Sequence, residues 1–225
     1  TDKPADPGYS ADLMHYDIPQ DCYDNFNRLP VLDVPTKSIL EVFLNQVRDR
    51  PNHRFFGTRQ NNGDGSFGAY QWDTYQDIFV KYEEIAKGCK ALQLLQKVPG
   101  VNEDGKEWAF CGIWAKNRWE WHTTMLSAMV CKATVIGFYD SMGDSSVDYC
   151  LKQTKLETMF VTAAYLKKML GMRDQGLATF IKNIVLFDTD QESMTLMQRA
   201  KNEYQIRVFT LDEVREAGRA SSVAL

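Results

Sequence analysis

Strict alternation of short apolar runs with helix-like segments is the feature that most constrains the fold of this chain. Each run is followed by residues with helical periodicity, and the runs cover residues 108–115, 134–138, 158–161, 183–187 and 206–209. The run at 184–187 has no polar position, which is typical of a strand buried on both faces. Such alternating units build a parallel sheet through right-handed crossovers. The sequence therefore predicts an α/β fold, with a largely parallel sheet and helices on both of its faces.

The residues before 108 predict an entry region of a different kind. Ser38 and Glu41 have the spacing of a capping box, and apolar residues at helical spacing follow to about residue 50. Strand-like runs at 55–59 and 69–72 flank residues 61–65, which are rich in Asn, Asp and Gly. Because these residue types tolerate positive φ, we expect a hairpin there. A long amphipathic helix should come next.

The domain organisation follows from these patterns. Prolines and aromatic residues are scattered without period over 1–35, which predicts an extended arm. We expect 36–225 to form one incomplete N-terminal α/β domain. Its helix–hairpin–helix entry should cover 36–107, and its alternating strand–helix units should cover 108–225.

Composition limits the classes of partner and the compartment. A net charge of −4 and an isoelectric point of about 5.5 argue against nucleic acid, which requires clustered Lys and Arg. Five cysteines without a Cys-x-x-Cys pair suit a reducing, intracellular compartment, either the cytoplasm or the cytoplasmic face of an organelle membrane. Three scattered histidines show no metal-ligand spacing. No apolar stretch approaches the roughly 18 residues needed to cross a bilayer.

Four segments resemble one protein family, in the same order. Residues 112–121 read Gly-Ile-Trp-Ala-Lys-Asn-Arg-Trp-Glu-Trp, similar to a signature of eukaryotic long-chain acyl-CoA synthetases with Gly-Ile, three variable residues and Asn-Arg-Pro-Glu-Trp. The segment 137–143 resembles their Pro-Leu-Tyr-Asp-Thr-Leu-Gly turn. Those at 70–75 and 56–59 resemble a Tyr-x-Trp-x-Thr-Tyr segment and a Leu-Gly-x-Arg strand. The chain thus resembles the N-terminal portion of an AMP-forming, adenylate-forming ligase.

The motif residues are interpreted mainly as structural. We expect Asn117 and Glu120 to cap a helix that begins although Trp119 replaces the proline of the family. Asp140 follows a strand at the edge where α/β sheets bind ligands, so a ligand role stays open beside the favoured structural one. No catalytic, cofactor-binding or metal-binding residue is assigned. The family-motif positions are Asn117, Arg118, Glu120, Trp121, Tyr139, Asp140 and Gly143.

The resemblance implies a role in fatty acid and lipid metabolism. The family converts fatty acid, ATP and CoA to acyl-CoA, AMP and pyrophosphate, usually with Mg²⁺. It holds the phosphates with a Ser/Thr/Gly-rich loop ending in Lys-Gly, and no such loop occurs in this sequence. The adenine-binding strand, the acidic ribose-binding residue and the mobile C-terminal domain of the family have no counterpart either. We therefore expect the front portion of a long-chain fatty acid–CoA ligase, inactive by itself.

Two other readings remain. The first is a catalytically inactive ligase-like subunit with a structural or interaction role. The second is an unrelated nucleotide-binding α/β domain, against which the missing Gly-x-Gly-x-x-Gly counts. Under either ligase-like reading, strands apolar on both faces predict an open sheet, covered by the rest of the ligase or by a protein partner. Association with a membrane surface also stays open.

Overall fold

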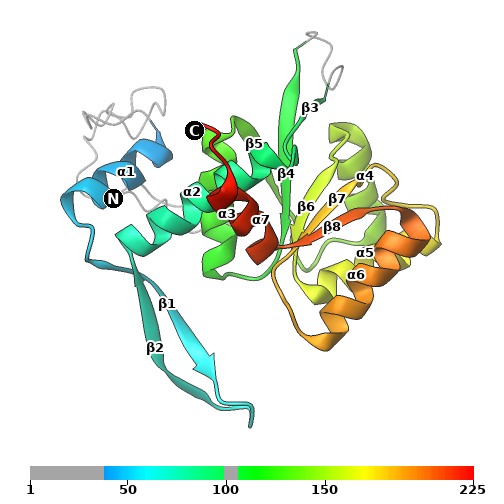
Figure 1. Ribbon diagram of the computed structural model, residues 1–225. Helices are drawn as coiled ribbons and strands as arrows, with labels where there is room; N and C mark the ends of the chain where they lie inside the picture. The colour runs from blue at the N-terminus through cyan, green and yellow to red at the C-terminus, as the bar shows by residue number, and fades with distance from the viewer. Residues whose placement is uncertain (1–37, 99–105) are drawn as a thin grey trace, which may run out of the picture. The chain divides into compact units, whose positions relative to one another are not determined.

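The computed structural model describes residues 38–98 and 106–225, and the compact unit they form begins at Leu40 and ends at Leu225 (Figure 1). The predicted arm at 1–35 lies outside the described residues. The entry region holds a helix, two strands and a second helix: α1 (Ile39–Asp49), β1 (Arg54–Asn61), β2 (Phe67–Thr74) and α2 (Tyr75–Ala91). This order is the predicted helix–hairpin–helix.

The hairpin has the turn chemistry that its sequence indicates. β1 and β2 pair in antiparallel fashion, and Gly63 and Gly65 adopt φ of +83° and +85° between them. The Asn61 and Asp64 side chains accept hydrogen bonds from backbone amides two residues further on. Thr74 then begins α2 with a complete capping box, in which its hydroxyl accepts from the Asp77 amide. The hairpin confirms the prediction.

The central sheet contains five parallel strands and one short antiparallel strand among the described residues. Gly112 of β4 pairs with Ile136 of β5 and with Met159 of β6, so these two strands flank β4 on opposite sides. The order is therefore β5-β4-β6-β7-β8, and these five strands run parallel to one another, which confirms the predicted parallel sheet. Their bounds are β4 (Trp108–Trp114), β5 (Ala133–Gly137), β6 (Thr158–Val161), β7 (Asn183–Leu186) and β8 (Arg207–Thr210).

The antiparallel strand β3 (Lys97–Val98) was missed by the sequence analysis. It pairs with Trp108 and Ala109 at the start of β4. Two residues are too few to show a period in the sequence, so only the tertiary pairing reveals this strand.

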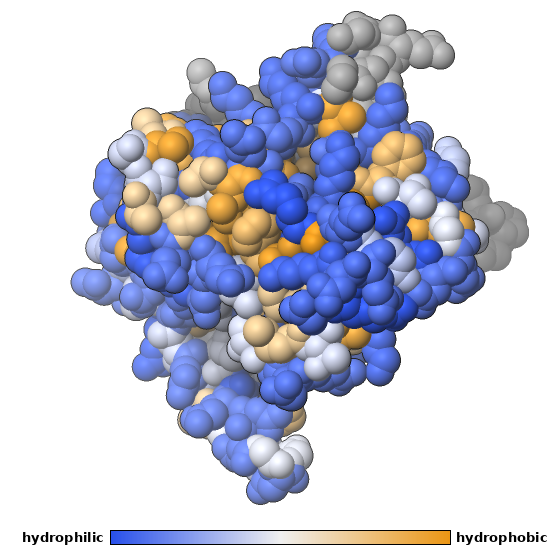
Figure 2. All heavy atoms as spheres, turned by 45° about the vertical axis from the view of Figure 1, so that its right-hand side comes forward, coloured by the Kyte–Doolittle hydropathy of each residue, from blue (hydrophilic) through white to orange (hydrophobic). Residues whose placement is uncertain are grey.

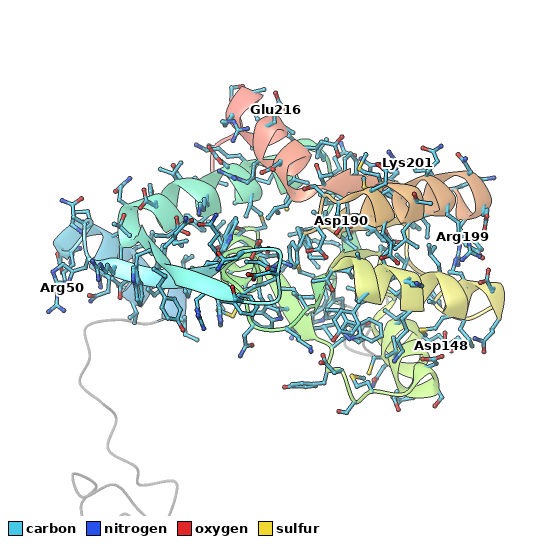
Figure 3. All side chains as sticks on the ribbon, turned by 90° about the horizontal axis from the view of Figure 1, so that it is seen from below. Arg50, Asp148, Asp190, Arg199, Lys201 and Glu216 are labelled. Atoms are coloured by element: carbon cyan, nitrogen blue, oxygen red, sulfur yellow. The ribbon has the colours of Figure 1, made fainter. Side chains whose placement is uncertain are left out.

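Helices cover both faces of the sheet. α2, α3 (Trp119–Val130) and α7 (Leu211–Ala220) pack on one face, and α4 (Asp144–Thr154), α5 (Ala163–Asp174) and α6 (Gln191–Tyr204) pack on the other (Figure 1). Figure 3 shows α5 and α6 side by side, with Asp190 at the start of α6. The Asp190 carboxylate accepts from the Ser193 amide at 2.9 Å and caps this helix.

The two cores follow from the pleat of the strands. Phe160 and Val185 point to the α2–α3–α7 side, whereas Met159 and Ile184 point to the α4–α5–α6 side. All four are fully buried. The side that carries α4, α5 and α6, brought forward in Figure 2, is mainly hydrophilic, with a smaller central group of hydrophobic residues. The helices bury both faces of the central strands β6 and β7, whereas the outer strands β5 and β8 keep exposed and half-buried positions, so the sheet is less open than expected.

The entry region carries many of the exposed apolar side chains. Phe67, Tyr70 and Trp72 of the hairpin are exposed, as are Ile39 and Val42 of α1. The base of the hairpin is covered, because the Phe55 ring stacks on Tyr75 with 4.3 Å between ring centroids. The outer part of the hairpin and α1 thus present exposed apolar groups, whereas Tyr149 and Met194 are exposed singly on α4 and α6.

Candidate functional site

The candidate site is the edge of the sheet where the parallel strands end. The chain leaves β4 toward β5 on one side and returns across β4 to β6 on the other side, so the strand order reverses between β4 and β6. In doubly wound sheets, ligands bind in the crevice at this reversal, outside the carboxyl ends of the strands. The segments that meet there are 115–118 after β4 and Thr162 with Ala163 after β6.

An ion network occupies this crevice. The Arg118 guanidinium donates to both carboxylate oxygens of Glu120, at 2.8 and 2.6 Å, and to Asp188 Oδ1 at 2.8 Å. Asp188 Oδ2 in turn accepts from the amide of Ala163, the first residue of α5, at 2.7 Å. Four consecutive polar contacts therefore join the loops that follow β4, β6 and β7.

The charge of Arg118 is engaged by partners within the network, the carboxylates of Glu120 and Asp188. Burial disfavours the charge of Arg118, but its hydrogen bonds with Glu120 and Asp188 outweigh that effect and raise its pKa. The guanidinium also lies 5.4 Å from the centre of the Phe187 ring. Since two carboxylates already engage one cation, Arg118 has little capacity left for a phosphate group.

The start of α3 differs from the sequence prediction. The N-cap residue is Arg118 rather than Asn117, and it makes no side-chain capping hydrogen bond. Glu120, expected to complete a capping box, is drawn instead to the Arg118 guanidinium. The proposed cap is therefore wrong, because the ion pair competes for the same carboxylate. The helix nevertheless begins at Trp119, whose ring lies 4.1 Å below the Lys81 ammonium.

The second motif cluster lies beyond β5. Asp140 accepts a hydrogen bond from the Tyr165 hydroxyl of α5, and its carboxylate is 3.9 Å from Lys116 Nζ. Burial, followed by the hydrogen bond to Asp140, raises the pKa of Tyr165 to about 12. Tyr139 beside it is 73% exposed. Asp140 thus has protein partners, and a ligand role for it remains a hypothesis.

Two clefts flank the network and bring most of the motif residues together. The first has a volume of about 550 Å³ between the hairpin and the start of α3, and Asn117, Arg118 and Glu120 line it. The second, about 570 Å³, lies between α3 and the end of β5, and Asn117, Trp121, Tyr139 and Asp140 line it. Gly143 lines neither cleft and serves as the N-cap residue of α4. The motif positions are therefore neighbours at one edge of the sheet, except for Gly143.

Sequence reasoning missed Asp188, Tyr165 and Phe187. A usable signal was present for Asp188, since an acidic residue directly after a buried parallel strand lies at the ligand edge of the sheet. The motif search did not include it because Asp188 lies 70 residues from Arg118. In the described part of the chain, no group of three or more His, Cys, Asp or Glu side chains could hold a metal ion.

Comparison with known proteins shows which proteins this chain resembles. No family model matches. The sequence is 26% identical to fatty acyl-CoA synthetase B of Dictyostelium discoideum over 186 residues, which are 82% of this chain and 25% of that protein. It is 26% identical to long chain acyl-CoA synthetase 2 of Arabidopsis thaliana over 185 residues, 81% of this chain and 25% of that one. The chain thus spans about a quarter of the length of the curated relatives that it matches.

Solved structures show the same fold. The adenylation domain of a carboxylate reductase from Mycobacterium chelonae aligns with a TM-score of 0.63 and 10% identity, over 83% of this chain and 30% of that one. The didomain of a carboxylic acid reductase from Segniliparus rugosus, solved with AMP, aligns with a TM-score of 0.57 and 17% identity, over 83% of this chain and 27% of that one. The chain is therefore similar in sequence to long-chain acyl-CoA synthetases and has the fold of the N-terminal part of adenylate-forming ligases.

Proposed function

We propose that this chain is the front portion of a long-chain fatty acid–CoA ligase, which joins fatty acid to CoA through an acyl-adenylate formed from ATP. The observation that carries the proposal is the alignment with acyl-CoA synthetases over about four fifths of the chain. The order of the four family segments at 56–59, 70–75, 112–121 and 137–143 supports it.

Within such a ligase, this portion supplies a scaffold. The network of Arg118, Glu120 and Asp188 fixes three strand-end loops, and the residues that hold ATP, Mg²⁺ and CoA come from the rest of the enzyme. ATP, when bound there, activates the fatty acid carboxylate for transfer. Arg118 fits this scaffold role, because its guanidinium already pairs with Glu120 and Asp188.

The compartment is proposed from the thiols. Cys89, Cys111, Cys131 and Cys150 are free, which suits a reducing, intracellular environment. No helix within 38–98 and 106–225 has the length and apolarity needed to cross a membrane. Both observations are compatible with an enzyme that acts on the cytoplasmic side.

The test combines mass and activity of the native protein. An antibody raised against the folded 225-residue chain, which has a mass of 25.8 kDa, captures the protein from its source. We expect a mass about three times larger, since the 186 aligned residues of this 225-residue chain are 25% of the length of the relative. We also expect the captured protein to exchange pyrophosphate into ATP in the presence of fatty acid. Exchange without fatty acid, or with amino acids in its place, would contradict the proposed substrate.

A ligase-like interaction subunit is the second candidate. The observation that favours it is the ion network at the reversal between β4 and β6, where Asp188 engages Arg118 and the Ala163 amide at the edge that binds ligands in doubly wound sheets. A native protein of 25.8 kDa without exchange activity supports this candidate over the ligase. The recombinant chain alone should show no exchange under either proposal.

A further inference from the structure

One face of the β1–β2 hairpin carries aromatic rings interleaved with arginines. In the strand register, Trp72 lies opposite Gly57 and Tyr70 opposite Arg59. Directly opposed residues share a face of an antiparallel pair. We call the set Arg54, Gly57, Arg59, Phe67, Tyr70 and Trp72 the hairpin aromatic face. The three rings are 52%, 57% and 45% exposed for Phe67, Tyr70 and Trp72.

Gly57 makes this face flat. A Cβ at Gly57 would lie 3.0 Å from ring atoms of both Trp72 and Tyr70, so the two rings rest on the backbone where a side chain would otherwise stand. The ring centroids of Tyr70 and Trp72 are 5.6 Å apart. Two rings that lie along the hairpin surface expose their broad sides together.

The arginines stack on these rings without an acidic partner. The Arg54 guanidinium lies 5.7 Å from the Trp72 ring centre, and that of Arg59 lies 5.4 Å from Phe67. Arg59 also donates to the backbone carbonyls of Phe67 and Gly68. Among the described residues neither arginine forms an ion pair. The nearby Asp73 carboxylate is held by Lys81 at 2.7 Å. The face therefore presents guanidinium charge that anionic oxygens can complement.

We propose that the hairpin aromatic face rests on the headgroup layer of an anionic lipid bilayer. Trp and Tyr combine an apolar body with a polar tip and concentrate at the boundary between lipid and water. Guanidinium groups bind the phosphate oxygens of lipid headgroups in a planar, bidentate manner. The biological reason for this contact rests on the proposed function, because a fatty acid ligase draws its substrate from lipid.

Area and charge favour a membrane over other occupants. Aromatic side chains offer about 150–250 Å² each, so three half-exposed rings present on the order of 300 Å². A stable protein interface needs about 800 Å² per partner. A net charge of −4 argues against single-stranded nucleic acid, the other usual ligand of stacked rings and arginines. The contact must be shallow, since unpaired strand edges are not tolerated in the hydrocarbon layer.

The full 225-residue chain is tested by sedimentation with vesicles of phosphatidylcholine alone and with added phosphatidylserine, without ATP or fatty acid. The hairpin variant carries Phe67→Ser, Tyr70→Ser and Trp72→Thr. The matched control carries Tyr149→Ser and Met194→Ser, which remove exposed apolar side chains from α4 and α6. We expect the hairpin variant to lose at least about tenfold in vesicle partitioning, while the control partitions like the original chain.

Two further readouts locate the contact. Replacing both arginines (Arg54→Gln, Arg59→Gln) should abolish the preference for phosphatidylserine, and Trp72→Phe should remove the blue shift of fluorescence on vesicle binding. Circular dichroism melts confirm that every variant folds. Equal partitioning of the hairpin variant and the control overturns the proposal, as does a chain that ignores all vesicles or binds oligonucleotides instead. Because no substrate is present, these outcomes are independent of whether the ligase activity is found.

Discussion

Arg118 and Asp188, 70 residues apart in the sequence, meet at 2.8 Å and join the loops that follow β4 and β7. Asp188 also contacts the start of α5, because its carboxylate accepts a hydrogen bond from the Ala163 amide. Glu120 binds the other side of the same guanidinium and is itself only 7% exposed. One arginine thus pairs with two carboxylates at the point where the strand order reverses.

Replacing Arg118 should destabilise the fold. Arg118→Gln leaves Glu120 and Asp188 without their cation, and we expect the free energy of unfolding to fall by about 2–4 kcal/mol, because an uncompensated carboxylate remains partly buried. Urea denaturation measures the change. Adding Glu120→Gln and Asp188→Asn should restore part of the loss.

An exposed arginine provides the matched control. Arg199 also contacts two carboxylates, those of Asp174 and Glu203, but these partners are 45% and 52% exposed. Arg199→Gln should change stability little, since solvent screens such pairs. Similar losses in the free energy of unfolding for both arginines would show that the network at the sheet edge contributes no more to stability than an exposed ion pair does.

The crossing of α2 and α7 depends on two glycines. A Cβ at Gly88 would lie 1.9 Å from the Val214 carbonyl oxygen, and one at Gly218 would lie 1.9 Å from that of Glu84. Each Gly→Ala change should destabilise the chain by about 2–3 kcal/mol, because the helices must move apart. Thermal unfolding reports the effect.

A substitution at Gly171 in α5 serves as the control, because it changes helix propensity without a steric clash. A Cβ there meets no atom within 4 Å, so Gly171→Ala should stabilise the protein by about 0.5–1 kcal/mol. If all three alanine variants gained stability, the close approach of α2 and α7 would be refuted.

Asp148 on α4 should make stability depend on pH in the acid range. The carboxylate, which is 6% exposed, bonds Lys152 and accepts from the Ala178 amide at 2.9 Å (Figure 3). The hydrogen bond with Lys152 is the largest cause that lowers its pKa; burial opposes the shift and the Ala178 amide supports it. A lowered pKa stabilises the fold above the unfolded value, about 3.9, and this contribution disappears as the pH falls through the folded value.

Asp148→Asn therefore should lower the free energy of unfolding by about 1–2 kcal/mol at neutral pH. The difference should shrink as the pH is lowered below about 4, which urea denaturation at a series of pH values would show. A difference that stays constant across that range would mean that the carboxylate charge is not involved.

Tyr165 should make the stability of the fold depend on pH in the alkaline range. Its pKa is raised to about 12, first by burial and then by its hydrogen bond to Asp140. A raised pKa stabilises the fold below the unfolded value of about 10, and the contribution is lost as the pH rises through the folded value. Asp140→Asn should lower the pKa of Tyr165, measured as phenolate absorbance with Tyr165→Phe as the reference. An unchanged titration would disprove the coupling.

Local patterns determined the order and type of the elements in this protein. The capping boxes at Thr74 and Thr210 are local features of this kind, because a hydroxyl and a carboxylate three residues apart interact within one helical turn. The apolar run at 183–187 fixes a strand buried on both faces, and the alternation of such runs with helices fixes a parallel sheet. These features depend on neighbours along the chain.

Only the tertiary structure decided what the motif residues do. Asn117 has the residue type of a helix cap, yet Arg118 takes the N-cap position and holds Glu120, because a guanidinium is a stronger partner for a carboxylate than a backbone amide. Asp188 comes to Arg118 because the carboxyl ends of parallel strands gather at one edge, however far apart they lie in the sequence. The tertiary structure likewise decided that β6 and β7 lie in the middle of the sheet and are buried on both faces while β5 and β8 lie at its edges, since the order of the strands across a sheet cannot be read from local periodicity.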